Sequence, residues 1–204
     1  ADPNYANGIW MATLIQQYSK VDEVRVCPNA TQTNSPPSAN YGANNGDTGT
    51  ADHSWWRPST LSTGGVKIFA GSYAYNGWLY YDASARGATY PQYLFRKESA
   101  IQRPTQTPVF ADGMWVDAWP IATDTPSRDL YNGAYGGAGM GRYTIARHGA
   151  GSAASAPRNV PAGQKLPSVL VMGFADGHAE AVKLEYLWTY SWHADYTPPA
   201  VRPP

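Results

Sequence analysis

Hydrophobic and polar positions alternate most regularly in residues 169–182, where two apolar arms flank Asp176-Gly177. Asp-Gly readily adopts the positive φ angles of a type I′ turn, so this segment is predicted to form a β-hairpin. Residues 108–119 contain the same tetrapeptide, Phe-Ala-Asp-Gly, with Asp112-Gly113 between apolar arms. A second β-hairpin is therefore predicted around Asp112-Gly113.

Further strand predictions rest on shorter apolar runs. Residues 66–77 are predicted to form a strand that reaches a turn at Asn76-Gly77, and residues 78–81 would form the returning strand. Two short strands are predicted over residues 24–27 and 141–148, where apolar and polar residues alternate.

Helical spacing is confined to the two ends of the chain. Ile9, Leu14 and Ile15 recur near helical spacing, so a short amphipathic helix is predicted over residues 9–18. A helical turn is predicted over residues 184–188, just before the end of the patterned sequence.

Two long segments rich in small and polar residues, 29–65 and 120–167, are predicted to be loops, and residues 197–204 form a Pro-rich tail. A chain of 204 residues suits one domain, here predicted to span residues 1–204. The expected fold is α+β: an antiparallel β-sheet with the two hairpins, a short N-terminal helix and the two long loops.

Composition and charge exclude several classes of protein. Lys+Arg and Asp+Glu number 15 each, which argues against a nucleic-acid partner. Charged residues make up only 15% of the chain, below the roughly 25% of an ordinary soluble domain. No stretch approaches the ~18 apolar residues of a membrane span, so no membrane contact is expected from this segment. The single cysteine, Cys27, is expected to be a small buried apolar residue.

Two groups of residues could bind metal ions. Loop carboxylates could wrap a calcium ion with the help of backbone carbonyls, although solvated side chains are the simpler interpretation. These candidates are Asp112, Asp117, Asp124 and Asp129. His148, Asp176 and His178, with His193 nearby in sequence, could instead form a transition-metal site of a metal-dependent enzyme, or only structural hydrogen bonds. No Gly-x-Ser-x-Gly motif indicates a hydrolase.

Aromatic residues form a third group of candidates. Exposed rings of Trp and Tyr can stack on the faces of sugars, so these residues could belong to a carbohydrate-binding module, although a structural role is the simpler interpretation. The alternative is that a charge-poor domain uses these rings to cover its sheet and hold its loops. The residues concerned are Trp55, Trp56, Trp78, Tyr80, Tyr81, Trp115 and Trp119.

An ordered set of short motifs resembles a known family. The motifs are Trp10-x3-Leu14-x3-Tyr18, Val24-Arg25-Val26-Cys27-Pro28, Gly71-Ser72-Tyr73-x-Tyr75-Asn76-Gly77-Trp78, Arg147-His148-Gly149 and Phe174-Ala175-Asp176-Gly177-His178. Together they resemble the prepilin-type, pseudopilin-like proteins of planctomycete and verrucomicrobial lineages, which are named for a His-x9-Asp-Gly motif. Here residues 149–175, 27 positions, separate His148 from Asp176.

The resemblance implies a non-enzymatic, extracellular or cell-envelope head domain of a type IV pilus or type II secretion-type filament. Such heads assemble with other pilin-like subunits through an N-terminal apolar helix that this sequence does not contain. The resemblance gives His148 and Asp176-Gly177 a structural role, in which His148 hydrogen-bonds across to the hairpin turn. Calcium held by loop carboxylates in related pseudopilins implies a similar role for Asp112 and Asp117, and a displayed head could also bind polysaccharide.

Overall fold

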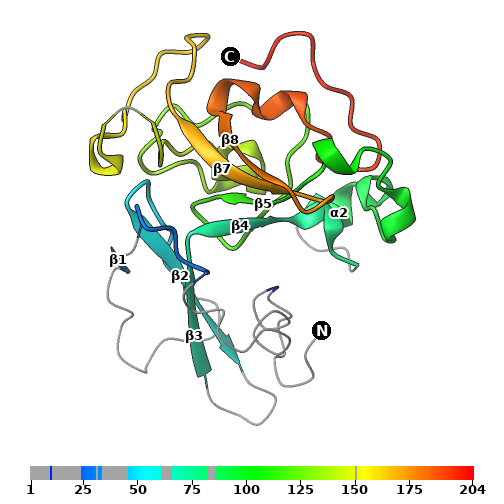
Figure 1. Ribbon diagram of the computed structural model, residues 1–204, viewed down its shortest axis with the longest axis horizontal. Coiled ribbons are helices and arrows are strands. Elements are labelled where there is room, and N and C mark those ends of the chain that lie inside the picture. The colour runs from blue at the N-terminus through cyan, green and yellow to red at the C-terminus, as the bar shows by residue number, and fades with distance from the viewer. Residues whose placement is uncertain are drawn as a thin grey trace.

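The computed structural model describes residues 10, 24–30, 32–33, 46–60, 66–81, 86–149 and 151–204. Over these residues the chain forms two β-sheets that adjoin one another, with long irregular segments covering the larger sheet (Figure 1). The strands are β1 (Gln32–Thr33), β2 (His53–Thr60), β3 (Val66–Gly71), β4 (Tyr73–Asn76), β5 (Pro108–Asp112), β6 (Asp117–Ala118), β7 (Val169–Phe174) and β8 (Ala179–Lys183).

The larger sheet has the strand order β6-β4-β5-β7-β8. Its β4–β5, β5–β7 and β7–β8 pairs are antiparallel, whereas β4 and β6 run parallel. The register between β5 and β7 shifts between Pro108 and Phe110, which marks a bulge or irregularity. Strand β5 therefore lies in the middle of the sheet, with a neighbour along each of its edges.

The smaller sheet has the order β1-β2-β3, and it meets the larger sheet where β3 gives way to β4. The chain passes from one sheet to the other at Ser72, whose side chain is fully buried. A Cβ atom on Gly71 would lie 2.7 Å from the Trp55 ring, so this crossing requires a residue without a side chain. The backbone of Ser72 is thereby held close to both sheets.

Helical structure in the described residues is short. Residues Arg86–Thr89 form the α-helix α2, and Trp10 is also helical. The 3-10 helices are η1 (Gly77–Leu79), η2 (Pro91–Tyr93), η3 (Glu98–Ala100), η4 (Pro104–Gln106), η5 (Gly136–Ala138), η6 (Met140–Arg142), η7 (Ala153–Ser155) and η8 (Leu184–Thr189). Within the described ranges, no helix has the length and apolar character needed to cross a membrane.

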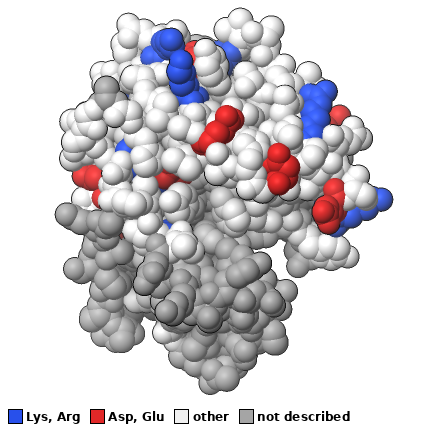
Figure 2. Space-filling model, in the orientation of Figure 1, with Lys and Arg blue, Asp and Glu red and all other residues white. Residues whose placement is uncertain are grey.

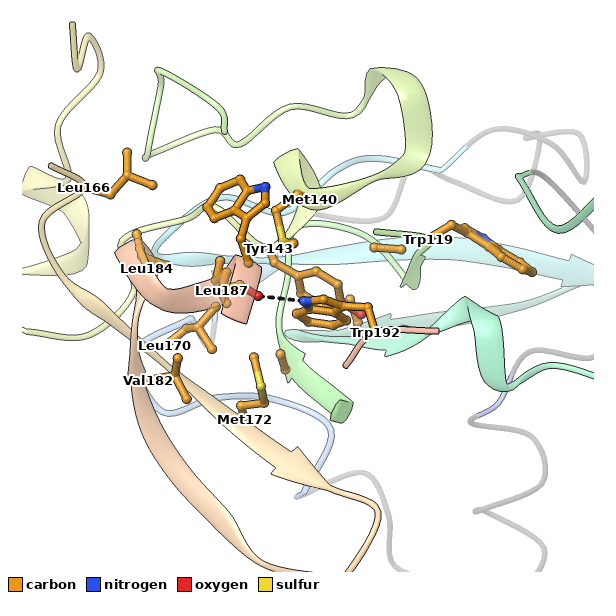
Figure 3. Packing of buried hydrophobic residues seen from close by; sticks show 14 of the residues in the cluster. Trp119, Met140, Tyr143, Leu166, Leu170, Met172, Val182, Leu184, Leu187 and Trp192 are labelled. Atoms are coloured by element: carbon orange, nitrogen blue, oxygen red, sulfur yellow. Dashed lines mark hydrogen bonds between the residues drawn. The ribbon is translucent and has the colours of Figure 1, made fainter. Parts of the chain in front are cut away.

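The main core lies between the β7–β8 hairpin and the irregular segments above it. Leu170, Met172 and Val182 point from the hairpin toward Leu184 and Leu187 of η8 (Figure 3). The ring of Trp192 stacks on that of Tyr143 at a centroid distance of 4.8 Å, and its Nε1 donates a hydrogen bond to the carbonyl of Leu187. Burial of these apolar side chains is what holds the long segment after β6 against the sheet.

Several sequence predictions are confirmed. Strands β7 and β8 form the antiparallel hairpin expected over residues 169–182, and Gly177 adopts a φ of 91° in its turn. The helical turn predicted over residues 184–188 is η8, and the Pro-rich tail has no regular structure. The coarse α+β class also agrees with the antiparallel sheets and the few short helices.

The hairpin predicted at Asp112-Gly113 is wrong. Strand β5 is already paired with β4 on one edge and β7 on the other, so the chain that follows cannot fold back onto it. Strand β6 pairs instead with β4, in a parallel arrangement. A buried strand with two neighbours thus overrides the local turn preference of Asp-Gly.

Other strand predictions are also corrected. Residues 24–26 form a turn and bends, and Cys27 has no regular structure. Residues 141–148 begin in η6, pass through a turn and irregular chain, and end in the β-bridge of His148. Residues 78–81 do not return as a strand, because the Asn76 side chain accepts a hydrogen bond from the backbone of Trp78 and starts η1.

The two long loops have different outcomes. The segment predicted over residues 29–65 contains strand β2, which the polar composition concealed. Residues 120–167, by contrast, hold only short 3-10 helices and the isolated β-bridge of His148 in the part that the structure describes. The helix predicted over residues 9–18 lies outside the described residues except for Trp10, which is buried.

Candidate functional site

The site centres on Asp112, which ends β5 and is completely buried. Its Oδ1 accepts a hydrogen bond from Arg147 Nη1 at 3.0 Å, and its Oδ2 accepts one from the backbone N–H of Val171 at 2.7 Å. The same Oδ2 lies 3.1 Å from Nε2 of His148. The buried carboxylate is therefore contacted by the Arg147 guanidinium, the His148 ring and one backbone N–H, and these contacts compensate for its removal from water.

The glycine that follows Asp112 allows this close approach. A Cβ atom on Gly113 would lie 2.4 Å from the Cβ of Ala74, so only glycine fits beside β4. The backbone N–H of Gly113 donates to the carbonyl of Ser72 at 2.9 Å. This contact fixes the end of β5 at the junction of the two sheets, with the Asp112 side chain facing inward.

Arg147 is fully buried and saturated with acceptors. Besides Asp112, its guanidinium donates to the backbone carbonyls of Thr50, Ala51, Ser72 and Gly113. These carbonyls belong to the segment before β2, to the crossing between the sheets and to the end of β5. Arg147 thus holds three parts of the chain around one carboxylate, which is the geometry that a planar guanidinium favours.

His148 is held by backbone and side chain. Its backbone forms a β-bridge with Val169 at the start of β7, and Ser168 Oγ donates to its carbonyl oxygen. Its ring Nε2 lies 3.4 Å from Cys27 Sγ, and Nδ1 lies 3.0 Å from the side-chain nitrogen of Asn29. Cys27 is 1% exposed, whereas the His148 side chain is 23% exposed and forms the accessible side of the site.

The contacts of the site shift the pKa values of two of its groups. Hydrogen bonds to Asp112 and then to Cys27 raise the pKa of His148 to about 10. Burial by itself would raise the pKa of Asp112, but the His148 hydrogen bond, the Arg147 charge and the Val171 N–H together lower it. Asp112 is therefore charged at neutral pH, and the imidazolium form of His148 is favoured beside it.

The contact predicted between His148 and the Asp176-Gly177 turn is absent. His148 adjoins Val169 at the first residue of β7, while the turn follows the last residue of that strand. Asp176 pairs instead with its neighbour His178, at 2.5 Å between Oδ1 and Nδ1. The predicted cluster of His148, Asp176 and His178 is not formed, because the six residues of β7 separate its members.

His193 lies elsewhere again. Its ring stacks on that of Tyr93 at a centroid distance of 3.9 Å, and burial lowers its pKa to about 4. It is a neutral core histidine at physiological pH, which agrees with the structural interpretation of this residue rather than the metal-binding one.

The four carboxylates considered for calcium lie in four separate sets of contacts. Asp117 pairs with Arg142 at 2.9 Å, and burial raises its pKa despite that charge. Asp124 pairs with Arg86 at 2.6 Å, and Asp129 accepts hydrogen bonds from the backbone of Tyr131 and Asn132. With Asp112 bound to Arg147, no three of them meet in one group within the described ranges.

The aromatic residues considered for sugar binding are mostly core residues. Trp55, Trp56, Trp78, Trp115 and Trp119 are all buried. A Cβ atom on Gly77 would lie 2.3 Å from the Trp119 ring, so that ring occupies a slot lined by backbone. These five rings cannot present a face to a sugar, and the sheet-covering interpretation is the better one for them.

The two tyrosines of that group lie nearer to solvent. Tyr80 is half-buried and its ring lies 4.9 Å from that of Tyr75, whereas Tyr81 is 75% exposed. A single exposed ring does not form the stacking platform that was predicted from the clustered aromatic sequence.

Sequence reasoning missed the partnership of Cys27, Asp112, Arg147 and His148. Cys27 is buried as expected, but it contacts His148, 121 positions away. Two signals in the sequence could have indicated it. One is the adjacent Arg147-His148 pair, and the other is Asp112, which lies between apolar residues and can end a buried strand instead of forming a turn. Comparisons with known protein families, with curated proteins and with solved structures each gave no match.

Proposed function

We propose that this chain is a non-enzymatic, extracellular head domain of a pilin-like or pseudopilin-like subunit, part of a type IV pilus or type II secretion-type filament. The observation that supports this proposal is the role of the two motif positions. His148 holds the first residue of β7 through a β-bridge, and Asp176-Gly177 closes its hairpin with β8. His148 does not reach the turn, but both positions fix strand β7 in the larger sheet, which agrees with a structural role.

The distribution of burial supports a structural role as well. Asp112 and Cys27 are almost entirely removed from solvent, so the reactive groups of the site are not presented to a large substrate. On the face drawn in Figure 2, the Lys, Arg, Asp and Glu side chains of the described residues are scattered and gather in no single patch. A weakly charged outer face suits a subunit that lies beside identical copies in a filament coat.

The first experiment is to read the native gene upstream of the codon for Ala1. A processing site of the Gly-Phe-Thr-x-Glu type, followed by about 20 apolar residues, is expected because a helix of that length spans a bilayer and could form a filament core. An ordinary signal peptide without such a helix would overturn the proposal.

A second experiment locates the protein on cells. Antibodies raised against residues 86–204 should label filaments sheared from the cell surface, and the label should disappear when the chromosomal gene is deleted. Detection only in the cytoplasmic fraction would contradict the proposal.

A further inference from the structure

We infer that Cys27, Asp112 and His148 form a binding site for a divalent transition-metal ion of the zinc class. Their ligand atoms are a sulfur, a carboxylate oxygen and an imidazole nitrogen, and all three lie within 4.8 Å of one another. Among the residues that the structure describes, no other three His, Cys, Asp or Glu side chains meet in this way. The site is independent of the filament proposal, because a head domain could assemble with or without a bound ion.

Two of the three distances between the ligand atoms are close to those around a tetrahedral ion, and the third, between Asp112 and Cys27, is within 4.8 Å. Zinc bonds of roughly 2.0–2.3 Å at tetrahedral angles place N and O about 3.4 Å apart, and N and S about 3.6 Å apart. In the structure, His148 Nε2 lies 3.1 Å from Asp112 Oδ2 and 3.4 Å from Cys27 Sγ. Each pair therefore needs to separate by only a few tenths of an ångström to admit the ion.

The ligand types decide the class of ion. A thiolate and an imidazole favour zinc, cobalt and similar ions, whereas calcium takes six to eight oxygen ligands. Asp112 is the only carboxylate of the three. Three protein ligands leave the fourth tetrahedral position for water or another donor, and the partial exposure of His148 gives the ion an access route.

Binding requires two protons to leave. The ion takes the position between Nε2, Oδ2 and Sγ that an Nε2 proton would otherwise occupy, and Cys27 binds as the thiolate. No electron is transferred, and both protons pass to solvent. Asp112 is already a carboxylate, because Arg147 and the Val171 N–H stabilise its negative charge.

The surroundings of the three side chains orient them. Arg147 holds Oδ1 of Asp112, so that Oδ2 faces His148. Asn29 lies against the other ring nitrogen of His148, at 3.0 Å from Nδ1. A metal-bound imidazole usually donates its second N–H to an oxygen. The Asn29 Nδ2 also donates to the backbone carbonyl of Arg147 at 3.2 Å. Rotation of the amide by half a turn would supply the oxygen to His148 in exchange for that hydrogen bond.

Cobalt(II) is the probe of choice, because a thiolate ligand gives a sulfur-to-cobalt charge-transfer band and a tetrahedral site gives strong visible bands. Protein purified under reducing conditions and treated with EDTA is titrated with CoCl2. We expect both features at one ion per chain, and their loss when ZnCl2 is added. Zinc should also raise the melting temperature, while CaCl2 should not.

Three variants test the assignment. Cys27→Ser, close in size to the native residue, should lose the charge-transfer band. His178→Gln is the matched control, since it alters the exposed His178–Asp176 pair, which has no thiol nearby, and it should retain the band. Asn29→Asp places a carboxylate beside Nδ1 of His148. It should tighten cobalt binding by about tenfold, which is the lower end of the effect of a residue that hydrogen-bonds to a metal ligand.

The outcomes are separable. Absence of the charge-transfer band in folded wild-type protein, or its persistence in Cys27→Ser, would overturn the site. Far-ultraviolet circular dichroism confirms folding of each variant. If Cys27→Ser fails to fold, the tighter binding by Asn29→Asp still supports the site, and unchanged or weaker binding by that variant refutes it.

Discussion

The tetrapeptide Phe-Ala-Asp-Gly occurs at residues 110–113 and at residues 174–177, and its two copies lie in opposite environments. In the first copy, Asp112 is buried and Phe110 is half-exposed. In the second, Phe174 is buried and Asp176 is exposed. Each aspartate contacts a histidine, His148 in the first case and His178 in the second.

The difference comes from the neighbours of each strand. Strand β5 has β4 and β7 on its two edges, so its Asp-Gly ends a central strand and the carboxylate turns into the protein. Strand β7 has an edge onto which β8 folds back, so its Asp-Gly forms an exposed turn. Identical local sequence therefore yields a buried charge in one place and a surface turn in the other.

The two aspartates should show the largest difference in their contribution to stability. Asp112→Asn should lower the free energy of unfolding by about 3–5 kcal/mol, because it leaves the buried Arg147 without a counter-charge. Asp176→Asn should leave it nearly unchanged, because that side chain is exposed. Urea unfolding followed by circular dichroism measures both, and equal losses would contradict the comparison.

The phenylalanines should show the reverse order. Phe174→Ala should cost about 3 kcal/mol, since its buried ring stacks on His178 and contacts Tyr190. Phe110→Ala should cost clearly less, because that ring is half-exposed. The same urea experiment applies, and a greater loss in Phe110→Ala would show that the rings do not follow their burial.

The glycines come next. Gly113→Ala should destabilise the protein by about 2 kcal/mol, because its Cβ would meet Ala74 in a packed sheet. Gly177→Ala has open space for its Cβ but must adopt a φ of 91°, so a loss of about 1 kcal/mol is expected. Melting temperatures of the two variants rank them, and a more stable Gly113→Ala would refute the close-approach argument.

A smaller effect is expected from pH, because solvent screens the partly exposed His148. The pKa of His148 is raised to about 10 in the folded state, above its value of about 6.5 in an unfolded chain. The stabilisation is therefore complete below pH ~6.5 and is lost as pH rises toward about 10. The decline in melting temperature over that range should be shallower in His148→Gln, and an equally steep decline would contradict the assignment.

Some of this architecture follows from sequence alone. The β7–β8 hairpin was predictable because alternating apolar residues flank Asp176-Gly177, and η8 because Leu184, Leu187 and Trp188 recur at helical spacing. In both cases the determining interactions are local, within a few positions of one another.

The site depends on contacts that local sequence does not encode. Asp112 and Arg147 are 35 positions apart, and Cys27 and His148 are 121 apart. Whether Asp112 forms a turn or a buried ion pair depends on β4 and β7, which flank β5 only in the assembled sheet. Local sequence also does not show whether a tryptophan is buried or exposed. A Trp ring near a glycine can pack against the backbone in the core or lie on a surface loop, and only the tertiary packing decides between the two.

The guanidinium of Arg147 also bears on how the molecule loses its structure. It donates to Ala51, to Ser72 and to Gly113, so it joins the segment before β2, the crossing between the sheets and the end of β5. Separating the two sheets would strip these acceptors from a buried cation. The sheets should therefore melt together in one cooperative transition, and their most protected amides should exchange with deuterium at the same limiting free energy.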